Sequence, residues 1–296
     1  MNKARGRGAP RNRVAPYLFL LPNLVAVAVF SIWPMINGFK ESFFSAVEGQ
    51  PAQYIGLHNY HVLVSDAQFW GAMRNTVVFV VGFVVGTLVL ATALALLLNA
   101  QKWGSGLFRA AVYLPVLIAP IAVGFLWSWL LEPNSGVIDA LLGKLGLGQP
   151  QWLVTPHLAM GSVIFVELWG TIGFYALIVL GGLQGIDQAL YEAARVDGAS
   201  ELQQIRRITL PSLRPTLLVV TILATITGFQ AFDFLWTLTG GGPVGATTLI
   251  VQYIYTHAFV PPINFGMATA ASTLLFLILL VLTLVNLLIG RRRGAA

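Results

Sequence analysis

Long apolar runs separated by short polar segments dominate the chain. Six windows are each apolar enough and long enough to cross a membrane as a helix, which takes about 20 residues. They cover approximately residues 16–38, 71–98, 107–131, 156–183, 215–238 and 265–289. Prolines at 22, 34, 115 and 120 fall inside or beside these windows, and a membrane helix bundle tolerates them. The pattern predicts an all-α, polytopic membrane protein with six transmembrane helices.

The composition supports this prediction. Of the 296 residues, 57% are hydrophobic and only 9% are charged, whereas an ordinary soluble domain carries roughly 25% charged residues. This balance argues against a water-soluble enzyme. The chain has no cysteine, which rules out disulfides and cysteine-based metal or nucleophile sites. The first apolar window is too long for a cleaved signal sequence, so we expect it to remain as a helix.

The basic residues are unevenly divided between the two sides that six spans would create. Of 17 lysines and arginines, only Lys40, Arg74 and Lys144 fall on the side opposite the termini. Basic residues tend to stay in the cytoplasm, so both termini are predicted to be cytoplasmic. The basic tails 1–13 and 291–296 would then flank a transmembrane domain over 14–290. The net charge of +6 reflects this topology and not nucleic-acid binding.

Three segments are predicted on the opposite, external side of the membrane. They cover about 39–70, 132–155 and 239–264 and contain several glycine and proline clusters. Such clusters are typical of turns and loops. We therefore expect these segments to be polar and irregular, with room for a short amphipathic element in the first.

The longest cytoplasmic connection is predicted over about 184–214 and contains both acids and arginines. Its apolar positions, beginning with Ile186 and Leu190, recur at helical spacing. Gly198 allows a tight turn that ends this helix, and Ser200 is a candidate N-cap for a second one. The residues predict two short helices at a bend, which by themselves are also compatible with an amphipathic element that binds anionic lipid.

A specific spacing inside this loop favours another interpretation. Glu192-Ala193-Ala194 is followed after three residues by Gly198, and after nine more by Ile208 and then Leu210-Pro211. This pattern resembles the EAA loop in the permease subunits of binding-protein-dependent ABC importers. Two further segments resemble the carbohydrate-uptake branch of that family, with its maltose-, lactose- and glycerol-3-phosphate-type permeases: Ile55-Gly56-Leu57-His58-Asn59-Tyr60 and Leu238-Thr239-Gly240-Gly241-Gly242-Pro243.

The resemblance implies a type I ABC importer permease fold in a bacterial-type inner membrane. It implies as partners a second related permease, two ATPase subunits, an extracytoplasmic solute-binding protein, membrane lipid and a sugar substrate. In this family the loop is the coupling element that docks on a cytoplasmic ATPase subunit. The residues that would take this role are Glu192, Ala193, Ala194, Asp197, Gly198, Ile208, Leu210 and Pro211.

No phosphate-binding loop of the form GxxxxGK[ST] occurs in the sequence. We therefore expect the chain not to be an enzyme, with ATP and Mg²⁺ bound by the partner ATPase. His58 and His61 are three residues apart, but no third ligand is near them in the sequence. No metal site and no cofactor on this chain are predicted.

Two carboxylates, Glu167 and Asp233, lie inside the fourth and fifth predicted spans. An acid within the membrane is costly unless it faces the bundle interior or a wet cavity. In maltose-type permeases, which this chain resembles, positions matching several of the residues around them lie at the transport cavity. The cavity candidates are Glu167, Thr171, Phe174, Tyr175, Gly228, Gln230, Ala231 and Asp233. Alternatively, the two acids pair with a neighbouring helix or with a second permease.

The sequence as a whole favours translocation of a sugar or oligosaccharide. Glycerol-3-phosphate or a glycerophosphodiester is one alternative, but a phosphate would favour basic residues in the cavity and none is among the candidates. A self-contained secondary transporter that uses Glu167 and Asp233 as ion sites is another. It would require internal repeats or broken-helix symmetry, which the sequence does not display, and it leaves the 184–214 loop unexplained.

Overall fold

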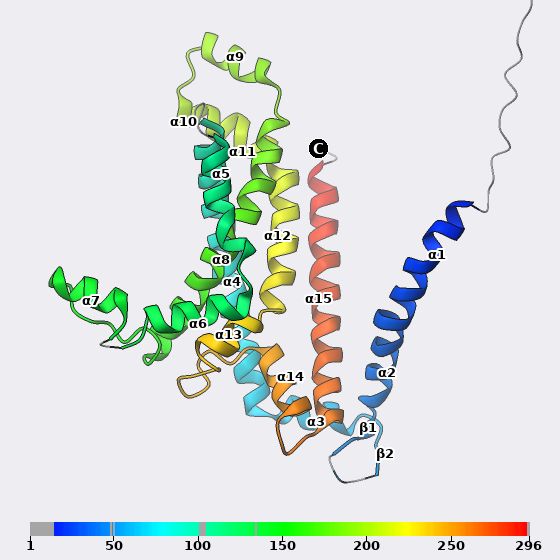
Figure 1. Cartoon of the computed structure of the whole chain (residues 1–296). Helices are drawn as coiled ribbons and strands as arrows, with labels where there is room; N and C mark the ends of the chain where they lie inside the picture. Colours follow the sequence, from blue (N-terminus) through cyan, green and yellow to red (C-terminus); the bar gives the residue numbers. More distant parts are fainter. Residues whose placement is uncertain (1–14, 48, 50, 101–104, 134, 295–296) are drawn as a thin grey trace, which may run out of the picture.

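The computed structural model describes residues 15–47, 49, 51–100, 105–133 and 135–294, and nearly all of its elements are helices, as predicted (Figure 1). The elements before the middle of the chain are α1 (Ala15–Val27), η1 (Ala28–Ile32), α2 (Trp33–Glu41), β1 (Phe44–Ser45), β2 (Gln53–Tyr54), α3 (His58–Ser65), α4 (Ala67–Ala100), α5 (Ser105–Tyr113), η2 (Leu114–Leu117), α6 (Pro120–Leu130) and α7 (Val137–Lys144). Those that follow are α8 (Pro156–Gln184), α9 (Gln188–Val196), α10 (Glu201–Gln204), η3 (Ile205–Thr209), α11 (Leu210–Ser212), α12 (Arg214–Phe229), α13 (Asp233–Leu238), α14 (Ile250–Phe259) and α15 (Phe265–Gly294).

Four helical segments of the described chain are each long and apolar enough to cross a membrane. They are Leu20–Glu41, Ala67–Ala100, Pro156–Gln184 and Phe265–Leu288, and they coincide with the first, second, fourth and sixth predicted spans. Two bent helix pairs bring the possible number of spans to six. The predicted tail over 1–13 lies outside the described residues, whereas α15 continues as a helix through Gly294.

The third and fifth predicted spans are not continuous helices. Between α5 and α6 the backbone passes through the 3₁₀ turn η2 and becomes extended at Ile118, and the two helical parts meet at 94°. In the fifth span α12 ends at Phe229, and α13 begins only at Asp233. The apolar windows over 107–131 and 215–238 did not reveal these breaks, because hydrophobicity reports burial in lipid or protein and not the direction of the chain.

The three segments predicted to be external are more regular than expected. They contain α3, α7, α14 and a two-stranded hairpin in which Phe44 pairs with Tyr54. Contacts to the ends of the long helices order them. The Tyr253 hydroxyl of α14 donates a hydrogen bond of 2.6 Å to the carboxylate of Asp66, just before α4. Local glycine and proline signals could not reveal these contacts, which join residues far apart in the sequence.

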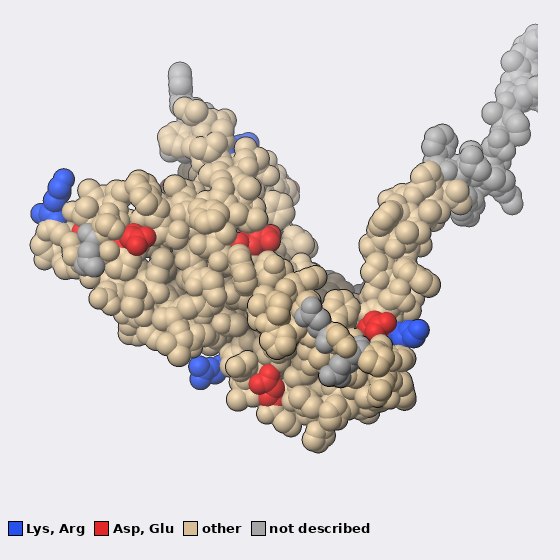
Figure 2. Space-filling view, turned by 60° about the horizontal axis from the view of Figure 1, so that its bottom comes forward, with Lys and Arg blue, Asp and Glu red and all other residues tan. Residues whose placement is uncertain are grey.

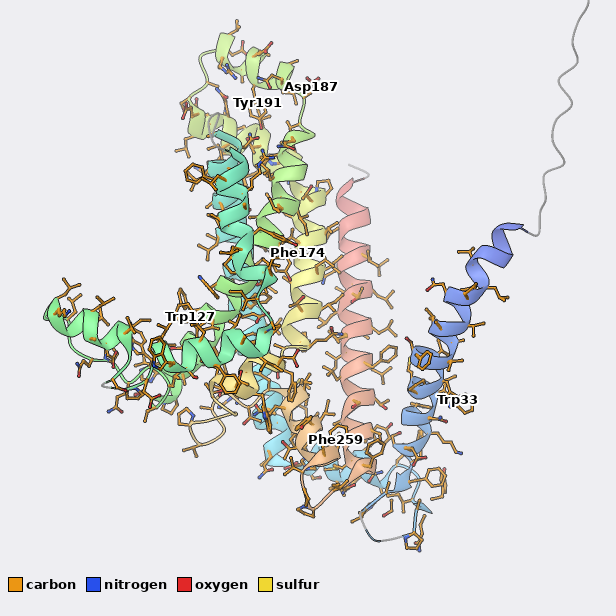
Figure 3. All side chains as sticks on the ribbon, viewed as in Figure 1. Trp33, Trp127, Phe174, Asp187, Tyr191 and Phe259 are labelled. Carbon is orange, nitrogen blue, oxygen red and sulfur yellow. The ribbon has the colours of Figure 1, made fainter. Side chains whose placement is uncertain are left out.

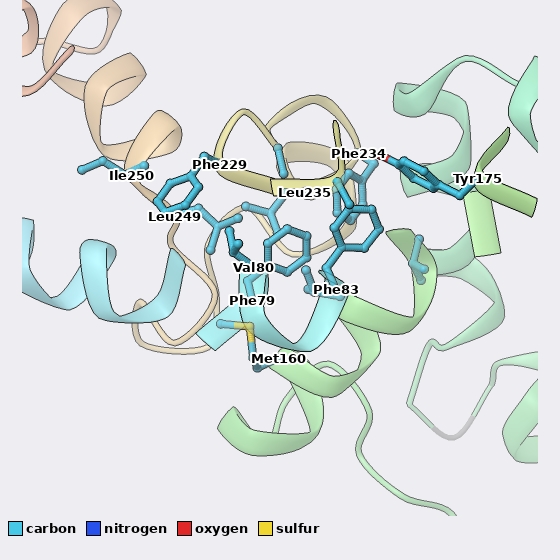
Figure 4. Close-up of a cluster of buried hydrophobic side chains, with 14 of the residues drawn as sticks. Phe79, Val80, Phe83, Met160, Tyr175, Phe229, Phe234, Leu235, Leu249 and Ile250 are labelled. Atoms are coloured by element: carbon cyan, nitrogen blue, oxygen red, sulfur yellow. The ribbon is translucent and has the colours of Figure 1, made fainter. Parts of the chain in front are cut away.

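The core lies where α4, α8 and α12 meet, and aromatic rings fill much of it (Figure 4). Phe79 and Phe83 of α4 stack with ring centroids 5.9 Å apart, and Phe83 contacts Tyr175 of α8 at 6.1 Å. On another side of α8, α5 approaches closely at Gly173. A Cβ atom there would overlap the backbone carbonyl oxygen of Val112 and lie 3.0 Å from the Cα of Tyr113. A residue larger than glycine would therefore push the third span away from the core.

The first span stands apart from this core. In its apolar window none of the side chains is buried within the chain, and Trp33 on α2 is 63% exposed (Figure 3). Its far end reaches the bundle through α2 and β1, which contact α15. Figure 1 places the start of α1, the end of α15 and helix α9 towards one end of the molecule, and α3, α14 and the hairpin towards the other. This arrangement agrees with an even number of spans; which end is cytoplasmic stays a prediction.

Candidate functional site

A cavity of about 340 Å³ opens where the third and fifth spans are broken. The η2–α6 break provides one wall, through Pro115, Ile118 and Pro120. The end of α12 and the start of α13 provide a second wall, and α8 provides a third wall. The breaks create the cavity because each one turns the backbone aside before the helix could fill the space.

Each break has a local feature that accompanies the end of a helix. Proline lacks a backbone N–H and clashes with the preceding helical turn, and Pro115 and Pro120 flank the extended residues between η2 and α6. At the other break, the backbone N–H of Gln230 bonds to the carbonyls of Ile226 and Thr227 and so closes α12. Helix α13 is then held against α6, because the Thr237 hydroxyl donates a hydrogen bond of 3.1 Å to the Ile121 carbonyl.

Five of the eight predicted cavity residues line this space: Glu167, Thr171, Gln230, Ala231 and Asp233. Glu167 is half-buried on α8, and Asp233 is exposed in the first turn of α13. The Thr171 hydroxyl donates to the Glu167 backbone carbonyl at 2.7 Å, so its oxygen lone pairs remain available as acceptors. The cavity therefore carries two carboxylates, an amide and hydroxyls, groups that hydrogen-bond to a polyhydroxylated ligand.

The other three predicted cavity residues do not line it. Phe174 on α8 is not among the lining residues and is 41% exposed (Figure 3). Tyr175 is buried in the core, where its hydroxyl donates to Thr227 at 3.1 Å. Gly228 packs against Val80 and Phe83 of α4. Proximity to Glu167 and Asp233 in the sequence therefore does not by itself place these three residues at the cavity.

The sequence did not identify the wall from the third span, where Val116, Ile118 and Val123 line the cavity. Phe232, next to Asp233 in the fifth predicted span, also lines it. The ring of Phe232 also packs against that of Tyr255, with centroids 4.9 Å apart. The two prolines in the third window were the available signal, since a proline inside a helix either kinks it or breaks it.

The 184–214 loop forms two short helical segments at a bend, as predicted. The side chain of Asp187 caps α9 by accepting a hydrogen bond of 3.0 Å from the Ala189 N–H. At the other end Gly198 has a φ of +75°, and the next amide, from Ala199, bonds to the Ala194 carbonyl at 2.9 Å. Ser200 begins α10 with a capping box to Gln203.

No residue of α9 is buried within the chain, and Val196 is 88% exposed. Of the predicted apolar stripe, Ile186 packs against the core, whereas Leu190 is 50% exposed. A hydrogen bond of 2.9 Å between the hydroxyls of Tyr191 and Thr209 nevertheless fixes α9 to the segment that follows it. Figure 3 shows Tyr191 and Asp187 at this end of the molecule, away from Phe259. Helix α9 is thus a braced, exposed projection, and the sequence did not single out its brace, Tyr191.

A bundle of membrane-spanning helices, broken around a cavity that contains carboxylates and hydroxyls and carrying an exposed loop between two cavity-lining helices, is typical of a membrane transport permease. The family follows from comparison with known proteins. The family model described as "Binding-protein-dependent transport system inner membrane component" matches residues 82–294. The chain belongs to this family of multi-pass inner membrane proteins.

Relatives and solved structures agree with this assignment. The chain is 37% identical over 278 residues to the trehalose/maltose transport system permease protein MalF of Thermococcus litoralis, covering 94% of each chain. It is 33% identical to the sulfoquinovosyl glycerol transport system permease protein SmoG of Agrobacterium fabrum, covering 95% of this chain and 92% of that one. A chain of a bacterial ABC transporter involved in the import of the acidic polysaccharide alginate matches with a TM-score of 0.84 and 29% identity, covering 95% of this chain and 96% of that one. A chain of a bacterial alginate ABC transporter, solved in complex with an alginate pentasaccharide-bound periplasmic protein, matches with a TM-score of 0.83 and 29% identity, covering 95% of both chains.

Proposed function

We propose that this chain is the permease subunit of an ATP-driven importer that translocates a sugar or oligosaccharide delivered by an extracytoplasmic solute-binding protein. The observation that carries the proposal is the connection between the cavity and the exposed loop. Helix α8 lines the cavity with Glu167 and runs directly into the loop, and α12, which lines it with Thr227, begins directly after the loop. A displacement of the loop therefore moves two cavity walls together.

In this mechanism a cytoplasmic ATPase subunit docks on α9. The small residues Ala193, Ala194 and Gly198 let another backbone approach closely, and the exposed Glu192 carboxylate accepts a charge-assisted hydrogen bond from a basic residue of the ATPase. Closure of the ATPase pair around ATP and Mg²⁺ moves this projection as a rigid body. The brace from Tyr191 to Thr209 passes the movement to the fifth span.

The cavity residues bind the substrate while it crosses. Glu167, Asp233 and Gln230 accept hydrogen bonds from sugar hydroxyls, and Phe232 offers an apolar face to the C–H surface of a ring. A second, related permease completes the cavity from the other side. Relatives named for trehalose/maltose and for sulfoquinovosyl glycerol support a carbohydrate substrate.

Uptake by the reconstituted complex tests this proposal. The chain is co-purified with its partner permease and ATPases, placed in proteoliposomes with the solute-binding protein, and supplied with labelled sugars or glycerol-3-phosphate, with and without ATP on the ATPase side. We expect ATP-dependent uptake of a sugar. Uptake driven by an ion gradient without ATP would instead support a secondary transporter, and uptake confined to glycerol-3-phosphate would contradict the choice of a sugar.

The orientation of the chain is part of the proposal and can be tested separately. Because the natural sequence has no cysteine, a single cysteine introduced at the exposed Val196 or Val244 reports one position only. A membrane-impermeant maleimide applied to whole cells whose outer surface is accessible should label the cysteine at 244 and not the one at 196. Labelling of both, or of 196 alone, would contradict cytoplasmic termini.

A further inference from the structure

A row of aromatic rings leads out of the cavity along α13 and α14. Phe232, which lines the cavity, packs against Trp236 with ring centroids 5.7 Å apart and against Tyr255 at 4.9 Å. The Tyr255 ring lies 5.0 Å from that of Trp236 and 5.2 Å from that of Phe259. These four residues are called the aromatic path below. Each ring contacts the next, so the row is continuous from the cavity to the end of α14.

Both helices that carry the aromatic path are fixed to the bundle. Within each helical segment the two rings are four positions apart, a spacing that brings side chains together on one face. The hydrogen bond from Thr237 holds α13 against α6. At the start of α14, the backbone N–H of Ile250 donates to the Thr76 hydroxyl of α4 at 2.8 Å, and Tyr253 bonds to Asp66 further along. The rings are therefore in place before a ligand arrives, which lowers the entropic cost of binding one.

The aromatic path remains accessible over its whole length. Trp236 is 42% exposed and Phe259 is 63% exposed, whereas Phe232 and Tyr255 are half-buried. This exposure distinguishes the path from the fully buried rings of the core in Figure 4. Phe259 lies at the end of the molecule remote from Tyr191 and α9 (Figure 3). The path therefore connects the cavity with the end that is predicted to be external.

The chemistry of the aromatic path suits a ring-shaped sugar. A pyranose has an apolar face of C–H bonds, which packs on the face of an aromatic ring, and a rim of hydroxyls, which bond to polar groups. Both kinds of group meet where the path enters the cavity, because Phe232 is followed by the exposed Asp233. The stretch 239–264 contains no Asp, Glu, Lys or Arg. On the face turned forward in Figure 2, charged side chains are few and widely spaced. A phosphorylated substrate would find no cation along α14.

Tryptophan and tyrosine also anchor proteins at the surface of a membrane, and two features favour a sugar over that role. Phe232 lines a cavity inside the bundle, where a lipid anchor has no function. Tyr255 is half-buried and contacts both Phe232 and Trp236, so it joins the exposed rings to the cavity. Lipid contact alone would not account for a row of rings that begins at a cavity wall.

We propose that the aromatic path is a binding track for pyranose sugars, along which the substrate passes from the external end of the chain into the cavity. The proposal rests on the proposed function and deepens it, since it assigns a route and a ring-shaped substrate class. The sugar slides from one aromatic face to the next and reaches Asp233 at the cavity. A sugar face laid on an aromatic ring buries a few tens of Å² of apolar surface, so the loss of one ring weakens binding roughly 3- to 10-fold.

The test measures sugar transported per ATP hydrolysed by the complete complex in proteoliposomes, with saturating, sugar-loaded solute-binding protein. The labelled sugars are glucose, trehalose, maltose, maltotriose and alginate oligosaccharides. Trp236→Leu and Tyr255→Leu keep an apolar side chain but remove the aromatic face, and we expect each to transport roughly 3- to 10-fold less sugar per ATP. Trp236→Phe, which keeps a ring, should restore most of the loss. Trp129→Leu is the matched control, because Trp129 on α6 is 61% exposed and does not line the cavity, and it should behave like the wild type.

Unchanged sugar transport per ATP in both leucine variants would overturn the proposal, and so would equal losses in Trp236→Leu and Trp236→Phe. If the leucine variants only reduced recovery of the assembled complex, the rings would contact lipid or the second permease and the proposal would fail. It would also fail if only the binding-protein concentration needed to stimulate ATP hydrolysis increased, because the rings would then contact that protein. Failure of the proposed function has a different signature, since the wild-type complex itself would then take up none of these sugars.

Discussion

Gly198 offers the sharpest test of the 184–214 loop, because its backbone conformation and its proposed docking role tolerate different substitutions. Its φ of +75° disfavours residues with a Cβ by roughly 1–2 kcal/mol. A Cβ at this position would meet no atom of the chain within 4 Å. Within this chain, therefore, the cost of a substitution comes from the backbone conformation and not from crowding. A docked ATPase adds crowding that this chain alone does not have.

Asparagine separates the two effects, since it tolerates the left-handed conformation but adds a side chain where the ATPase would approach. Gly198→Asn should keep the turn and leave assembly in the membrane unchanged. If the ATPase packs closely there, the inserted atoms cost about 1–3 kcal/mol of docking free energy, as overpacking does in a protein core. This corresponds to a roughly 5- to 150-fold weaker affinity for the ATPase subunit.

The assay measures sugar uptake and ATP hydrolysis by the reconstituted complex at several ATPase concentrations. Gly148→Asn is the matched control, because Gly148 has a φ of +77°, also has no atom within 4 Å of a Cβ, and lies in a segment predicted to be external. We expect Gly198→Asn to lose uptake and Gly148→Asn to retain it. Equal uptake by the two variants would refute close docking at α9.

Three further outcomes are expected. Gly173→Ala should lower the apparent melting temperature of the complex by several degrees, because pushing α5 away from α8 costs about 1–3 kcal/mol of folding free energy. Gly161→Ala, on the same helix but with no atom within 4 Å of the added Cβ, should be neutral or stabilising. Equal melting temperatures for the two variants would contradict this packing. Burial, and then the hydrogen bond to the Asp66 carboxylate, raise the pKa of the Tyr253 phenol. The stability that the protonated phenol contributes is therefore fully present below about pH 10 and falls at higher pH. Between pH 8 and 11, the melting temperature should fall less for Tyr253→Phe than for the wild type. Glu167→Gln should lower the rate of uptake at limiting substrate while the assembled complex is recovered normally. Unchanged uptake kinetics would show that Glu167 does not contact the substrate.

The sequence was most informative wherever the determining interactions are local. The two helices of the 184–214 loop, the turn at Gly198 and the cap at Ser200 were predicted correctly, because each depends on residues within a few positions. The long spans were likewise predictable, since about 20 apolar residues have only one stable backbone arrangement in lipid. The spacing of Glu192 to Pro211 also led to the correct family.

Only the tertiary structure decided where the helices break and which residues share the cavity. Pro115 and Pro120 are compatible with either a kinked span or a broken one, and the packing of α6 against α13 selects the break. Glu167 and Phe174 are seven positions apart on α8, yet only Glu167 lines the cavity. A cavity built from three separate spans depends on the relative orientation of helices. That orientation is set by packing between distant residues, and the local pattern of a single chain does not record it.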